Sequence, residues 1–224
     1  NYNASTSFNA KINSRLFIKI GAQAEWMNFD LQYRTRQFTP TWNQVWDFTD
    51  RTSLLQSFAH IKYSFSEKLT LNTGVHVQFL TLNNSTSLEP RLALRYQATP
   101  KSSIHAGYGL HSQMQPVDVY FYRKQQADGS YDATNTDIGF TRSHHFVIGY
   151  DVTPIKDWKV KTEVYYQQLF DVPVSDSNRS FSMLNTGASF QPNEQGYLIN
   201  SGTGRNYGVE LTVEKYFSKG FYGL

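Results

Sequence analysis

Hydrophobic and polar residues alternate along most of this chain, and the alternation is clearest in two neighbouring segments. In Leu69–Leu80 the odd-numbered positions are mostly apolar and the even-numbered ones mostly polar. Leu88–Ser112 repeats the pattern in two limbs, with a break at Thr99–Lys101. Because successive side chains of a strand point to opposite faces, this period predicts β-strands with one apolar and one polar face.

The same alternation predicts strands in the rest of the chain, at Ser5–Asn13, Leu16–Trp26, Thr52–Phe65, Ser143–Val152, Trp158–Phe170 and Gly202–Phe217. Phe221–Leu224 begins another, so about nine full strands and the start of a tenth are expected. Short turns are predicted near Ser14, Ser66, Thr99, Thr153 and Ser218. All long connections should then lie at the opposite end, which predicts an antiparallel up-and-down order.

The expected long connections are Asn28–Arg51, Gln113–Arg142 and Asp171–Asn200, with a further loop at Asn83–Thr86. Asn28–Arg51 is rich in aromatic residues and too irregular for a strand. We therefore expect this segment to form a structured outer loop.

The solvent of the apolar face decides the fold class. A soluble sandwich would show the same alternation. Long strands, aromatic residues near strand ends and the alternation of short with long connections are typical of a transmembrane β-barrel. Aromatic residues make up 16% of the chain, as expected for interfacial girdles. The sequence holds no apolar run of about 18 residues, which excludes a transmembrane helix.

Charge and composition exclude several other classes. The net charge is only +3, and the 21 basic residues are scattered, which argues against a nucleic-acid partner. The chain has no cysteine, so disulfides, thiolate metal sites and cysteine nucleophiles are absent. No signal peptide is present at Asn1 although a membrane barrel must be exported, so we expect part of a longer protein.

Several segments resemble TonB-dependent outer-membrane receptors, most closely those of Bacteroidetes-type bacteria. They are LEPRLALRY, SHHFVIGYD, EVYYQQLFDVPV, SFSMLNTGASF and GRNYGVELTVEKYFSKGFY. The resemblance runs from about Thr52 to Leu224 and is strongest over Ser143–Tyr222, with NYGVE (Asn206–Glu210) its most telling piece.

This resemblance implies a 22-stranded barrel in the bacterial outer membrane, with an N-terminal plug and a motif that engages the TonB protein. On that basis residues 1–224 form a barrel segment of about nine to ten strands, without the plug and the C-terminal strands. The implied partners are outer-membrane lipid, the TonB complex acting through a plug outside this chain, and a surface lipoprotein lid or other envelope proteins.

Charged residues on the polar faces are candidates for the lumen wall: Glu89, Arg91, Arg95, Lys159, Lys161, Glu163 and Glu210. One interpretation is structural, with cross-strand pairs that hold register and keep the interior hydrated. The other is functional, with a polar wall against which a plug rests and slides.

Aromatic residues in the predicted outer loops are the candidates for ligand contact: Trp42, Trp46, Tyr120, Phe121 and Tyr122, with Arg123 beside them. Flat rings offer apolar area at little cost in entropy, so they could grip a sugar, a peptide or a chelate. The alternative is that these residues pack within the loops or form the outer girdle.

Metal binding and catalysis find little support. His144 and His145 are adjacent and should point to opposite faces, whereas His105 and His111 share a face about 20 Å apart. The chain lacks GxSxG, HExxH and P-loop motifs. A surface-protease barrel would need Asp118, Asp137, His144 and His145 to meet at the outer rim. We therefore expect no cofactor, no metal site and no enzymatic activity.

The sequence supports active uptake of a nutrient through a TonB-dependent receptor, whose class (chelated metal, glycan or peptide) it leaves open. A receptor-like barrel that serves as a scaffold for other envelope proteins is the main alternative, and the protease barrel is the third.

Overall fold

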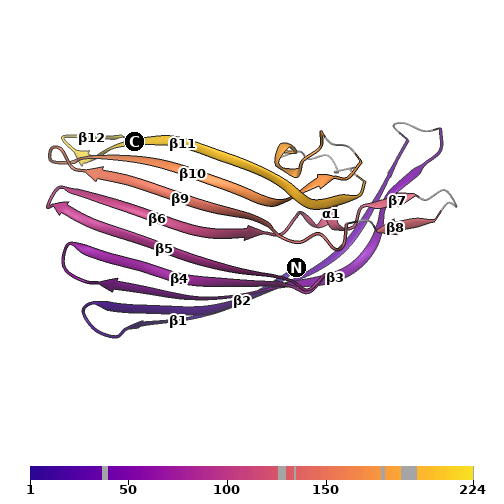
Figure 1. Ribbon diagram of the computed structural model, residues 1–224, viewed down its shortest axis with the longest axis horizontal. Helices are drawn as coiled ribbons and strands as arrows, with labels where there is room; N and C mark the ends of the chain where they lie inside the picture. Colours follow the sequence, from indigo (N-terminus) through magenta and orange to yellow (C-terminus); the bar gives the residue numbers. More distant parts are fainter. Residues whose placement is uncertain (37–39, 126–129, 134, 178–179, 188–195, 224) are drawn as a thin grey trace.

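The computed structural model describes the 224-residue chain except residues 37–39, 126–129, 134, 178–179, 188–195 and 224. Its main feature is one curved antiparallel sheet in which each strand pairs with the next strand of that sheet along the chain (Figure 1). The ten strands are β1 (Tyr2–Lys11), β2 (Leu16–Thr35), β3 (Asn43–Ser64), β4 (Leu69–Leu80), β5 (Ser85–Thr99), β6 (Ser102–Gln113), β9 (Thr141–Val152), β10 (Trp158–Ser175), β11 (Leu198–Ser218) and β12 (Phe221–Gly223).

This sheet confirms the predicted count of nine long strands and a short tenth. Five short turns lie together at one end, which we call the turn end (Figure 1). The opposite end, the loop end, carries the longer connections. One expectation is wrong there: the connection between β4 and β5 is only residues 81–84, a tight turn in which Asn84 has a φ of 58°. Ser85 and Thr86, expected in a loop, already belong to β5.

The largest correction concerns Asn28–Arg51, which was predicted to be a loop. Most of it is strand: β2 continues to Thr35 and β3 begins at Asn43, and the two pair as a hairpin that extends past the rest of the sheet (Figure 1). We call residues 28–35 with 43–51 the β2–β3 arm. The alternation continues in the arm with its sense reversed. The face that is apolar up to Trp26 carries Asn28, Asp30, Gln32 and Arg34, whereas the other face carries Phe29, Leu31 and Tyr33.

The two remaining long connections contain short elements. Between β6 and β9 lie α1 (Val117–Tyr120) and a small hairpin of β7 (Arg123–Gln125) and β8 (Tyr131–Ala133). The connection after β10 starts only beyond Ser175 and contains the 3-10 helix η1 (Met183–Asn185). Among the described residues, no helix is long and apolar enough to cross a membrane.

The apolar face of the sheet is uncovered along its length. Exposed fractions are 46% for Leu92, 64% for Ile148 and 70% for Val209, values that a water-soluble core would not show. On β2 this face runs from Leu16 to Trp26, about 33 Å along the strand. At a strand tilt of about 40° that length spans about 25 Å, the height of the apolar band of an outer-membrane barrel.

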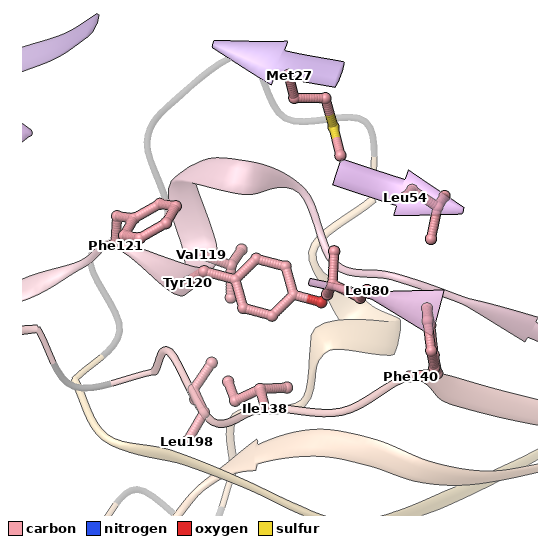
Figure 2. Close-up of a cluster of buried hydrophobic side chains, with 9 residues drawn as sticks. All are labelled: Met27, Leu54, Leu80, Val119, Tyr120, Phe121, Ile138, Phe140 and Leu198. Carbon is pink, nitrogen blue, oxygen red and sulfur yellow. The ribbon is translucent and has the colours of Figure 1, made fainter. Parts of the chain in front are cut away.

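A buried apolar cluster lies at the loop end, on the side away from the exposed apolar face. This loop-end cluster comprises Met27, Leu54, Leu80, Val119, Tyr120, Phe121, Ile138, Phe140 and Leu198 (Figure 2). Phe48 of the arm stacks on Phe121 with ring centroids 3.6 Å apart, and Trp46 Nε1 donates a hydrogen bond to the Asp118 carbonyl at 3.1 Å. The connection between β6 and β9 is therefore packed against the β2–β3 arm.

Candidate functional site

The polar face of the sheet carries a carboxylate that is almost completely enclosed. Glu89 on β5 is 1% exposed and accepts hydrogen bonds from Gln78 Nε2 at 2.5 Å, Ser87 Oγ at 3.2 Å and Arg91 Nη2 at 2.9 Å. His76 Nδ1 lies 3.0 Å from Oε2, the carboxylate oxygen that Arg91 also contacts. A buried carboxylate needs such partners because an uncompensated charge is costly away from water.

These contacts extend into what we call the Glu89 network. His76 Nε2 bonds to Gln56 Oε1 at 3.1 Å, and Gln78 Nε2 also donates to the Ser112 carbonyl at 2.9 Å. The network thus ties β3, β4, β5 and β6 together near the loop end. The sequence predicts Glu89 and Arg91 on the same polar face, among charged residues expected to pair across strands. It gave no sign of Gln56, Gln78 and Ser112, whose positions depend on the register of other strands.

A second group of charges, the Glu163 network, lies towards the turn end. Glu163 on β10 contacts Lys161 Nζ at 2.7 Å and His105 Nε2 at 2.9 Å. Directly opposite Glu163 on β11 stands Glu210, so two carboxylates face each other across the strands. Lys161, which contacts Glu163 and interacts electrostatically with Glu210, lowers the repulsion between them.

The remaining wall candidates lie on the same polar face, with different partners. Arg95 Nη2 contacts Asp151 Oδ2 at 3.2 Å and Ser103 Oγ at 2.8 Å, an arrangement that only the β6–β9 register reveals. Lys159 stands opposite Glu214 on β11. All seven predicted wall residues therefore share one face, and five of them take part in ion pairs.

Two adjacent hollows interrupt this polar face and share His145 and Val147 in their linings. The larger, about 320 Å³, is also lined by Glu163, Tyr165 and Glu210. The smaller, about 170 Å³, lies over Gly107 and Gly109 and reaches Arg91. Gly107 provides part of the space, because a strand position without a side chain leaves the wall open, whereas the His111 ring covers Gly109.

The predicted loop aromatics separate into two sets. Trp46, Tyr120 and Phe121 are 5%, 0% and 3% exposed within or beside the loop-end cluster, which is the loop-packing role. Burial raises the pKa of the Tyr120 phenol to about 12.

The second set remains accessible at the loop end. Trp42 is 60% exposed, and the Arg36 guanidinium lies 4.6 Å from its ring centroid. Tyr122 and Arg123 are half-buried, and Arg123 donates to the Asp47 carbonyl at 3.1 Å. Ligand contact by Trp42, Tyr122 and Arg123 stays a prediction.

The histidines and the candidate protease residues are dispersed. His144 bonds to the Tyr108 hydroxyl at 3.0 Å and stacks on Phe170, whereas His145 lies on the other face beside His111 and Tyr165. In the described part of the chain, no hydrogen bond joins Asp118 or Asp137 to either histidine. Within that part there is also no group of three metal-ligating side chains suited to one ion.

Solved structures share this fold at low sequence identity. The siderophore receptor PirA from Pseudomonas aeruginosa matches with a TM-score of 0.71 and 11% identity, over 97% of this chain and 40% of its own. The FrpB iron transporter from Neisseria meningitidis (F3-3 variant) matches at 0.64 and 11%, over 95% and 32%. The RagAB peptide importer in its closed-closed state matches at 0.59 and 12%, over 97% and 28%.

The chain therefore spans less than half the length of each of these structures. Curated protein sequences give no match. Residues 1–224 match the family described as "TonB dependent receptor-like, beta-barrel" along their whole length. Since the strand order, the exposed apolar face and the family match agree, the chain belongs to the β-barrel family of TonB-dependent receptors of the bacterial outer membrane.

Proposed function

We propose that this chain forms part of the wall and outer loops of a receptor that imports a nutrient actively across the outer membrane. The observation that supports this most strongly is the family match together with the two unlike faces of the sheet. One face suits hydrocarbon. The other carries the Glu89 and Glu163 networks, whose charges require water or a polar partner inside the barrel.

In this proposal the chain contributes no covalent chemistry. The wall strands enclose a lumen filled by a plug, and the TonB complex acts on that plug to drive release. The short turns then face the periplasm and the β2–β3 arm faces the medium. Trp42 at the exposed part of the arm, with Tyr122 and Arg123, would contact the ligand or its delivering protein.

The proposal extends to the chemical class of the imported ligand. Structures similar to this chain are a siderophore receptor, an iron transporter and a peptide importer. The exposed groups at the loop end combine aromatic rings with arginine, and such pairs suit ligands that carry both flat or apolar surface and negative charge. We therefore propose a ferric chelate or a peptide rather than a neutral sugar.

The experiment starts from the full-length protein in its native outer membrane. Small molecules that copurify with it are identified by mass spectrometry, and the cellular accumulation of each is measured with and without a protonophore. Import predicts energy-dependent accumulation that is lost when the gene is deleted. Accumulation that does not depend on the gene would overturn the proposal.

The same purification tests the scaffold alternative, which the projecting β2–β3 arm favours. A scaffold would copurify with envelope proteins, such as a surface lipoprotein, and would support no uptake. An importer with a lipoprotein lid would show both the partner and the uptake. Trp42→Ala should weaken partner or ligand binding without changing the amount of assembled barrel.

A further inference from the structure

A basic hollow lies on the polar face at the turn end, far from the loop-end cluster. It has a volume of about 440 Å³, and its lining includes Lys11, Arg15, Phe17 and Lys62. Lys11, Phe17 and Lys62 form one row across three strands, because Phe17 on β2 pairs with Lys11 of β1 on one side and Lys62 of β3 on the other. Two ammonium groups thus flank a ring that is 38% exposed.

The positive charge of this hollow is uncompensated in the described part of the chain. The lining includes no acidic residue, and none of the ion pairs there involves Lys11, Arg15 or Lys62. Lys62 is flanked by described strands on both sides, and its partner on β4 is the neutral Asn72. The next row adds Lys19 and His60, so the basic character extends over two rows.

The polar face is therefore electrically divided. Acidic groups lie on β9 to β11, at Asp151, Glu163 and Glu210, and are partly balanced by arginine, lysine and histidine. On β2 the same face carries Glu25, eight residues from Phe17, but no acidic residue lines the basic hollow, so its positive potential attracts an anionic occupant.

The position of the hollow limits what that occupant can be. Phe17 and Lys62 alternate along their strands with Ile18 and Ile61, which belong to the apolar face. The hollow thus opens away from the membrane, where lipid headgroups do not reach it. An aromatic floor between cations suits a peptide, whose carboxylates meet the lysines while its apolar atoms cover the ring.

We infer that the basic hollow binds an acidic peptide segment lying inside the barrel at its periplasmic mouth. This inference rests on the proposed function, in which a polypeptide fills the lumen. The segment would place Asp or Glu side chains between Lys11 and Lys62. The chemistry is that of partly hydrated ion pairs, so each lysine changes the affinity by up to about fivefold.

The test uses the full-length protein in outer-membrane vesicles. A carbodiimide joins lysine amines to carboxylates only when the two are in contact, and mass spectrometry identifies the joined peptides. We expect Lys62 or Lys11 to be joined to an Asp- or Glu-containing peptide outside the barrel strands. Lys62→Gln should remove its cross-link, whereas Lys101→Gln, at an exposed turn of the same end, should leave it.

Acetylation under the same conditions gives a second readout. Lys11 and Lys62 should react up to about fivefold more slowly than Lys101 and Lys156, and the difference should vanish in 1 M salt, where the screening length is about 3 Å. Equal reactivity without a cross-link would overturn the inference. Cross-links confined to a neighbouring barrel strand, or protection that depends on anionic lipid, would overturn it as well.

Uptake measured in the same cells distinguishes failure of the proposed import function from failure of the inference about the basic hollow. Energy-dependent uptake by a protein that shows no cross-link at Lys11 or Lys62 would overturn the inference about the acidic segment and leave the proposed import function intact. A cross-link in a protein that imports nothing would support the segment and count against import.

Discussion

His105 on β6 lies directly across from Gly149 on β9, and its imidazole covers the glycine so closely that a Cβ there would overlap the ring. The ring thereby passes over β9 and reaches Glu163 on β10 at 2.9 Å. Rings also cover directly opposed glycines in three other pairs: Phe58 over Gly21, His60 over Gly74 and Tyr165 over Gly208. Glycine at these positions lets a large side chain lie along the wall instead of projecting into the lumen.

Gly149→Ala should therefore destabilise the barrel. The new methyl group would displace His105 and break its contact with Glu163, at a cost of about 1–3 kcal/mol, the range for overpacking. The measurement is urea unfolding of the full-length protein in detergent, followed by the loss of the compact band on unheated gels.

Gly107→Ala is the matched control for this change. A Cβ at Gly107 would stand 3.7 Å from the Leu92 carbonyl and 3.8 Å from the Ala93 Cβ, both ordinary contact distances. This variant should unfold like the parent protein. Equal destabilisation by the two substitutions would show that the His105–Gly149 contact has no special role.

Glu89→Ala should be among the most damaging single substitutions in the chain. It leaves the enclosed Gln78 and Ser87 without their common acceptor, and a buried polar group that loses its partner typically costs about 1–3 kcal/mol. Glu67→Ala, at an exposed turn, is the control and should change the free energy of unfolding by about 0.5 kcal/mol or less. If Glu89→Ala unfolds like the control, the network carries little of the stability.

The assignment of the two faces can be tested at adjacent residues. Ile148 is 64% exposed on the apolar face, and Val147 lines both hollows of the polar face. An arginine facing the middle of the bilayer costs about 2–4 kcal/mol, so Ile148→Arg should destabilise the membrane-inserted barrel by that amount. Val147→Arg points to the lumen and should cost clearly less. The comparison is made by reversible unfolding from lipid vesicles, and the reverse order would contradict the assignment.

The strands were predictable from sequence because the membrane requires every strand to place apolar residues on its outward face. Leu92, Ile148 and Val209 face the same solvent, so their alternation is unbroken. That rule ends at Trp26. Beyond it the outward face meets water and the other face meets protein, so the apolar positions change sides. Because the alternation reverses after Trp26, the sequence of the β2–β3 arm looks irregular when one continuous apolar face is expected. The structure shows that β2 and β3 continue through it.

The candidate sites were predictable in part for a related reason. Alternation placed all seven wall residues on one face, because face depends only on the residue's own strand. It could not pair Arg95 with Asp151, which depends on the register between strands far apart in sequence. Nor could it separate Trp42 from Tyr120. Both are aromatic residues in expected loops, and the burial of Tyr120 depends on Leu80 and Leu198 from distant segments.

Tyr120 predicts a pH dependence that arises outside the membrane-spanning strands. Burial raises the pKa of its phenol from an ordinary 10.0 to about 12, and the hydroxyl accepts a hydrogen bond from the Gln115 amide at 3.1 Å. The folded state then holds the phenolic proton more tightly than the unfolded state. The stability from this group is complete below pH 10 and is lost as the pH rises towards 12, by about 2–3 kcal/mol in total.

Tyr120→Phe isolates this effect. It removes the ionising group and the acceptor of the buried Gln115 amide, so stability at neutral pH should fall by about 1–3 kcal/mol while the decline above pH 10 becomes shallower. Phe140→Leu, in the same cluster, should lower stability but keep the parent's decline. Unfolding midpoints in urea across this pH range give the slopes, and tyrosinate absorbance of the parent minus Tyr120→Phe gives the titration directly. A phenol that ionises at its ordinary pH in the folded protein would mean that the loop-end cluster admits water around Tyr120.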